Sequence, residues 1–167
     1  MQHEAKLYTL SLREQRTYAL TALFVLGNIA LPQLCHLAPY GGQMFLPIFF
    51  FTLVGAYKYG FTVGLATAVL PPIANSLLFG RPAGAMLPPM LLQSVLLAAV
   101  SAALARRMAD RVTPAALACV ATGCLLAGLL IERAMISVDH SVLTSMVRAV
   151  PGLLLQIFGG YYLIRKL

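Results

Sequence analysis

The chain has 167 residues, of which 60% are hydrophobic and only 10% are charged, and its mean hydropathy is +0.84. A soluble domain carries about 25% charged residues, so this composition excludes an ordinary soluble protein. The net charge of +7 does not indicate nucleic-acid binding, because the basic residues lie between apolar runs, where membrane proteins place cytoplasmic loops. We therefore expect a single all-α integral membrane domain, residues 1–167.

Residues 1–18 are expected to lie in the cytoplasm and to contain the start of the first helix. Ser11 and Glu14 have the spacing of a capping box, which begins a helix. A cleavable signal peptide is not expected, because Glu4 and Glu14 precede the apolar run and the run itself is longer than a signal sequence uses.

Six transmembrane helices are predicted from apolar runs that turn residues separate. The second run is short for a full crossing of the membrane. Thr113 and Pro114 supply an N-cap and a first-turn proline for the fifth helix. The predicted spans are residues 19–38, 44–57, 61–79, 85–105, 114–131 and 142–164.

The basic residues predict the orientation of these helices in a bacterial plasma membrane, with lipid around the bundle. If both termini are cytoplasmic, nine lysines and arginines lie inside and two, Arg81 and Arg133, lie outside, which agrees with the positive-inside rule. The inside residues are Lys6, Arg13, Arg16, Lys58, Arg106, Arg107, Arg111, Arg165 and Lys166.

Arg148 is the residue that points most directly to a binding site. It lies about seven residues into the sixth span, roughly 10 Å deep at about 1.5 Å per residue. A charge at that depth costs at least ~2.5 kcal/mol, so the side chain is expected to face the bundle interior or a wet cavity. There it can bind an anionic ligand. Alternatively, it forms an ion pair with Glu132 or Asp139, or it extends to the outer interface.

Other polar residues and several prolines lie in the same outer halves of the spans. Asn75 and Gln93 can each hydrogen-bond a ligand or a neighbouring helix. Arg81, on a turn, can lead an anion toward Arg148 or hold helix ends at the headgroups. His36 is a further candidate for ligand binding, with a place at the membrane interface as the alternative, and is not expected to be a metal ligand. Each proline frees a carbonyl and either lines a cavity or kinks its helix. These prolines are Pro71, Pro72, Pro88, Pro89 and Pro151.

Patterns for catalysis, metals and cofactors are missing from the sequence. There is no GxSxG, no HExxH and no GxxxxGK[ST], and five acidic residues leave little for acid–base chemistry. The three cysteines show no metal-binding spacing. We therefore expect neither an enzyme nor a cofactor or metal bound to this chain.

Three segments resemble the substrate-binding S components of energy-coupling factor (ECF) vitamin transporters. They are residues 46–64 (LPIFFFTLVGAYKYGFTVG), 75–82 (NSLLFGRP) and 87–90 (LPPM). The chain length, six-span layout and cytoplasmic termini resemble the family too. The resemblance implies that the protein binds a vitamin or related micronutrient from outside, in a pocket in its outer half. It then associates with a transmembrane coupling subunit and two cytoplasmic ATPases and topples to deliver the ligand.

The resemblance also implies that small residues of the first span dock the coupling subunit. Ala19, Ala22 and Gly27 fall within one broad stripe of that span, although the AxxxA spacing common in the family is absent. Packing inside this chain is the alternative. For the ligand, the outer arginines favour a carboxylate or phosphate. The competing function is a structural scaffold of the MreD cell-shape type, which needs no ligand.

Overall fold

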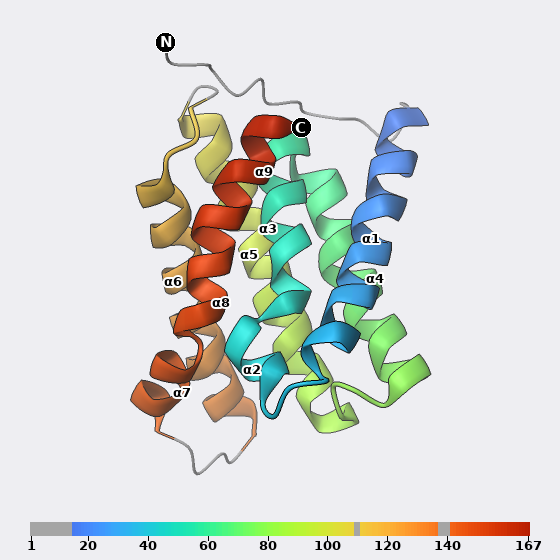
Figure 1. Ribbon diagram of the computed structural model, residues 1–167, viewed down its shortest axis with the longest axis vertical. Coiled ribbons are helices and arrows are strands. Elements are labelled where there is room, and N and C mark those ends of the chain that lie inside the picture. Colours follow the sequence, from blue (N-terminus) through green and yellow to red (C-terminus); the bar gives the residue numbers. More distant parts are fainter. Residues whose placement is uncertain (1–14, 109–110, 137–140) are drawn as a thin grey trace.

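The computed structural model describes residues 15–108, 111–136 and 141–167, in which it contains helices and turns but no strand (Figure 1). The prediction of an all-α fold is confirmed for this part of the chain, whereas the capping box at Ser11 and Glu14 lies outside it. The elements are α1 (Gln15–Cys35), α2 (Gly41–Phe45), α3 (Pro47–Tyr59), α4 (Phe61–Phe79), η1 (Gly84–Met86), α5 (Leu87–Arg107), α6 (Pro114–Met135), α7 (Val142–Arg148), α8 (Val150–Leu154), the π-helical η2 (Leu155–Gly159) and α9 (Gly160–Lys166).

Four helical stretches are long and apolar enough to cross a membrane, namely α1, α4, α6 and Gly84–Arg107, which joins η1 to α5. A fifth candidate is the pair Val142–Arg148 and Val150–Lys166, which is bent by 53°. The predicted second span corresponds to the short helix α2 and to α3, which has only 13 residues. The described residues therefore support four or five spans, and the total of six stays a prediction.

The helices run between two distinct ends of the bundle. The start of α1, the α5–α6 connection and the C-terminus lie at one end, which we call the terminal end (Figure 1). The helices α2 and α7 and the α4–α5 turn lie at the other, which we call the α7 end. This arrangement brings segments far apart in the sequence to one face of the molecule.

Helix α3 forms the centre of the bundle. Every α3 residue except Phe51 is buried, and α1, α4, α5 and α9 pack around it. A helix that is hydrophobic all round is expected to be buried in this way. Where α4 packs against α3, Gly64 lies on Ala56, and a Cβ on residue 64 would overlap with the alanine side chain. Small residues therefore allow the close helix packing on which membrane proteins depend.

A buried hydrogen-bond network centred on Asn28 joins α1, α3 and α4. Asn28 Nδ2 donates to Thr52 Oγ1 at 3.0 Å and to the Thr67 carbonyl at 3.3 Å. Asn28 Oδ1 accepts from the Phe51 backbone N–H at 3.2 Å. The Thr67 carbonyl is available because Pro71, four residues later in α4, has no N–H to donate. Pro71 thus frees the Thr67 carbonyl, and Asn28 hydrogen-bonds it, so the two residues together join α4 to α1.

Candidate functional site

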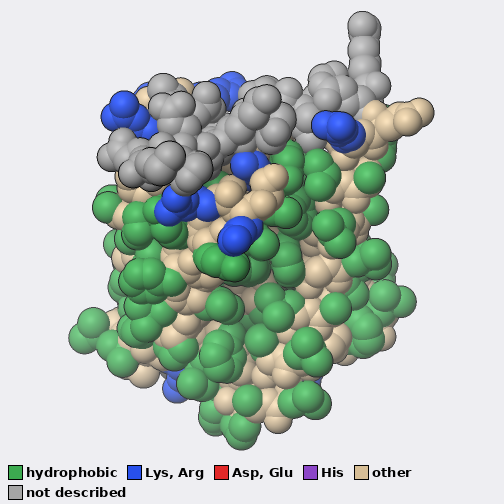
Figure 2. Space-filling view, turned by 45° about the horizontal axis from the view of Figure 1, so that its top comes forward, with side chains coloured by type: hydrophobic (Ala, Val, Ile, Leu, Met, Phe, Trp, Pro, Cys, Tyr) green, Lys and Arg blue, Asp and Glu red, His purple; other side chains and the backbone are tan. Residues whose placement is uncertain are grey.

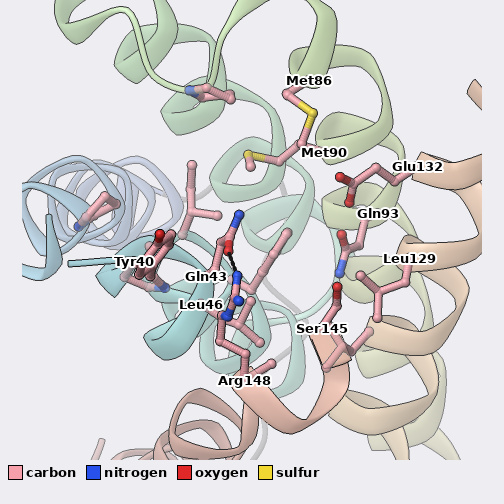
Figure 3. Close-up of a pocket in the computed structure, with 18 of the residues that line it drawn as sticks. Tyr40, Gln43, Leu46, Met86, Met90, Gln93, Leu129, Glu132, Ser145 and Arg148 are labelled. Atoms are coloured by element: carbon pink, nitrogen blue, oxygen red, sulfur yellow. Dashed lines mark hydrogen bonds between the residues drawn. The ribbon is translucent and has the colours of Figure 1, made fainter. Parts of the chain in front are cut away.

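A cavity of about 610 Å³ opens at the α7 end of the bundle. Its walls come from the end of α1, from α2, from the α4–α5 turn, from the first turns of α5, and from α6 and α7. Figure 3 shows the side chains that point into it. The volume lies within the range of small-molecule sites, about 300–1,000 Å³.

The prolines are less closely tied to this cavity than their positions predict. Of the five expected prolines, only Pro89 lines it. Pro71 and Pro72 are buried in α4 instead. The cavity-lining alternative therefore does not hold for the other four. At least one freed carbonyl, that of Thr67, is satisfied by side chains of neighbouring helices instead.

Arg148 lies on the cavity wall next to α2. It is the last residue of α7, so it lies at the bend before α8 rather than within one continuous sixth helix. Its Nη1 donates to Gln43 Oε1 at 2.8 Å, and its guanidinium carbon lies 5.0 Å from the centroid of the Tyr40 ring. The side-chain contacts that the structure gives for Arg148 are thus with Gln43 and Tyr40, and Asp139, one of the two alternative partners, lies outside the described residues.

The remaining donors of Arg148 give the site its chemistry. A guanidinium carries five N–H donors in a planar fork, and the bond to Gln43 occupies one of them. The same fork binds a carboxylate or phosphate through two parallel hydrogen bonds. Gln43 and Tyr40 therefore hold the guanidinium in place while leaving donors for an anion.

His36 and Arg81 both line the cavity, from the residue after α1 and from the α4–α5 turn. The imidazole lies on Gly42, where a Cβ would overlap with it. Burial, and secondly the positive charge of Arg81, lower the pKa of His36 below its ordinary value of 6.5. The imidazole is therefore neutral at pH 7, and the positive charge on this side of the cavity comes from arginine.

Acidification is expected to destabilise the protein through His36. Because the pKa of His36 is lower in the folded protein than 6.5, the unfolded chain takes up a proton at higher pH than the folded protein does. Stability is then lost as the pH falls through 6.5 toward the lowered pKa. Thermal unfolding in detergent at about pH 7.5 and about pH 5.5 measures this. The decrease in Tm between the two pH values should be smaller for His36→Gln than for the wild-type protein. An equal decrease in both proteins would contradict the role of His36 in this pH dependence.

Asn75 lines the cavity but is engaged in helix packing. It is 1% exposed, and its Oδ1 accepts from Gln33 Nε2 at 2.9 Å. Its Nδ2 donates to the Asn28 carbonyl at 3.0 Å, which is available because Pro32 of α1 has no N–H. These contacts favour the packing alternative for Asn75 over ligand binding.

Gln93 of α5 is arranged differently from Asn75. Its carboxamide lies on Gly128 of α6, where a Cβ would overlap with the amide atoms. The side chain extends toward Ser145 and lies on the side of the cavity that also holds Glu132 (Figure 3). Within the part of the chain that the structure describes, the Gln93 amide forms no hydrogen bond. It therefore keeps its donors and acceptor for another molecule.

The five predicted ligand residues share one cavity, although they come from different segments of the chain. They are His36, Asn75, Arg81, Gln93 and Arg148. Gln43, Met86 and Met90 also line the cavity, and the sequence analysis did not select them as ligand residues. The only signal for Gln43 was its polarity between two apolar runs.

The three predicted docking residues do not share one face. Ala19 and Ala22 are exposed on the outer side of α1. Gly27 faces α3, and a Cβ there would lie 2.6 Å from the Phe51 ring. Because Gly27 has no side chain, the Phe51 ring of α3 packs against it within this chain, whereas Ala19 and Ala22 remain accessible.

Together, the described residues define an all-helical protein whose apolar helices suit a multi-pass membrane protein and whose cavity has a basic wall at the α7 end. Comparisons with protein-family models, with curated proteins and with solved structures found no match to this chain.

Proposed function

We propose that this protein is the substrate-binding S component of an ECF importer in a bacterial plasma membrane. It captures a vitamin-like small molecule from outside for ATP-driven uptake by a coupling subunit and two ATPases. The observation that carries the proposal is the cavity of about 610 Å³ with the Arg148 guanidinium on its wall, at the end of the bundle opposite the C-terminus. A fixed guanidinium favours an anionic group on the ligand.

The orientation in the membrane is part of this proposal. Hydrophobic side chains cover the sides of the bundle, whereas lysines and arginines gather at the terminal end (Figure 2). By the positive-inside rule, the terminal end faces the cytoplasm and the cavity faces outward. In this topology α2 and α3 together make the second crossing and α7 to α9 the sixth, so both termini are cytoplasmic. The basic residues described at the terminal end are Arg16, Lys58, Arg106, Arg107, Arg111, Arg165 and Lys166.

The exposed face of α1 is the proposed contact with the coupling subunit. Ala19 and Ala22 are exposed there, with Leu23 and Leu26 beside them at 58% and 64% exposure. Small side chains allow another helix to approach closely. Gly27 supports this face indirectly, because its contact with Phe51 holds α1 against α3.

Native mass spectrometry of the purified protein tests the proposal. Protein released from membranes in mild detergent should carry one small molecule in stoichiometric amount, which dissociates on collisional activation. The opposite result is protein without a ligand that binds no member of a vitamin panel and co-purifies with cell-envelope proteins. That result would replace capture by the scaffold function.

A further inference from the structure

The cavity has two chemically different sides. Arg148, Gln43 and Tyr40 lie on one side in Figure 3, and Gln93, Ser145 and Glu132 lie on the other. The first side carries a guanidinium that is hydrogen-bonded to an amide oxygen at 2.8 Å. The second side presents a carboxamide, a hydroxyl and a carboxyl. A ligand that spans the cavity therefore meets the Arg148 guanidinium at one end and the Gln93 carboxamide and Ser145 hydroxyl at the other, while Arg81 and Arg133 also line the cavity.

The Gln93 carboxamide occupies space that α6 leaves open at Gly128. A side chain on residue 128 would overlap with the amide atoms of Gln93, so glycine is the residue that allows the amide to lie there. A second, small cavity of about 10 Å³ lies between Gln93 and Gln156, whose side chain is 2% exposed and belongs to the π-helical η2. Single turns of π-helix occur frequently at functional sites. The Gln93 side chain has no hydrogen-bond partner among the described residues.

An unpaired amide at a half-buried position has a chemical preference. Removing a donor or acceptor from water costs free energy unless a hydrogen bond replaces the lost water. A carboxamide offers one acceptor oxygen and two N–H donors. Its best complement is a group that carries both a donor and an acceptor side by side, as an amide, a urea or a lactam-type ring edge does. Discrimination against analogues that lack such a group is strong, because they leave the site's polar atoms unpaired.

We infer that the ligand of this site is bifunctional and that Gln93 determines its specificity. One end of the ligand is a carboxylate or phosphate bound by Arg148. The other end is an uncharged donor–acceptor edge paired with the Gln93 carboxamide, which Gly128 positions. The apolar part between them lies against Met86, Met90 and Leu46, which line the cavity. This inference rests on the proposed capture of a small molecule.

The test identifies the compound that co-purifies with the wild-type protein and measures its occupancy in three variants. Gln93→Leu removes the carboxamide at similar size, and Gly128→Ala displaces it. Gly123→Ala is the matched control, because a Cβ on that residue of the same helix meets nothing within 4 Å. We expect Gln93→Leu and Gly128→Ala to lower occupancy at least about tenfold, as loss of a buried hydrogen bond requires, with no change in Gly123→Ala. The Tm of each variant reports its folding.

Each outcome is decisive. The inference holds if the wild-type compound, identified by accurate mass and fragmentation, has both an anionic group and a donor–acceptor edge and is lost from the two cavity variants. It is overturned, with capture intact, if the compound lacks either group or if Gln93→Leu retains wild-type occupancy. The chemistry of the wild-type compound decides the matter even if a variant fails to fold. A wild-type protein without any compound overturns the proposed function together with the inference.

Discussion

Replacement of Arg148 by alanine is expected to lower ligand occupancy by about 10- to 100-fold while the protein still folds. A hydrogen bond to a charged group contributes about 1.5–3 kcal/mol, and each 1.4 kcal/mol is a factor of ten in affinity. The side chain is exposed and its protein partners are Gln43 and Tyr40, so its removal leaves no buried charge unpaired. Arg148→Lys keeps the charge but loses the planar fork and should give an intermediate loss.

Arg165 provides a matched control for this experiment. Its Nη1 donates to the Tyr161 hydroxyl at 2.9 Å, and its guanidinium carbon lies 5.3 Å from the centroid of that ring. It thus has the same kinds of contact as Arg148 but lies at the terminal end. Arg165→Ala should leave occupancy unchanged. If Arg148→Ala lowers Tm and retains the ligand, Arg148 has only the structural role, and the anion site must be sought elsewhere.

Replacement of Asn28 by leucine is expected to reduce the free energy of unfolding by about 2–4 kcal/mol. Hydrogen bonds between membrane helices average about 0.6 kcal/mol and reach about 1.7 kcal/mol, and Asn28 forms three. The change also leaves the Phe51 N–H without its side-chain acceptor in the core, which adds a desolvation cost. Titration with SDS from mild detergent, followed by circular dichroism, measures the free energy.

Two threonine variants control for the loss of polarity itself. Thr52→Val removes a hydroxyl that donates to the Thr67 carbonyl at 3.0 Å and accepts from Asn28. Thr122→Val removes a hydroxyl of α6 that has no hydrogen bond within the described residues. The first should destabilise the protein and the second should not. Unfolding of Asn28→Leu at the wild-type SDS concentration would show that the network contributes little.

The sequence by itself determined the helical membrane architecture. In lipid the backbone must satisfy its own hydrogen bonds, so long apolar runs form helices whatever the other contacts are. The positions of charged residues are informative for a similar reason. An arginine near an apolar run costs free energy anywhere except at an interface or a cavity. For this reason Arg81 and Arg148 could be chosen from the sequence, and both line the cavity.

Tertiary structure alone decided the position of α3 and the roles of the side-chain amides of Asn75 and Gln93. An apolar run reports burial but not whether lipid or protein surrounds it, and α3 is buried in protein. Asn75 and Gln93 look equivalent in the sequence. The fold brings Asn75 to the carbonyl that Pro32 frees, at 3.0 Å, whereas it places Gln93 on Gly128 at the cavity wall. Hydrogen-bond partners lie on other helices, so the helix packing, rather than the local sequence, determines which amide is left for a ligand.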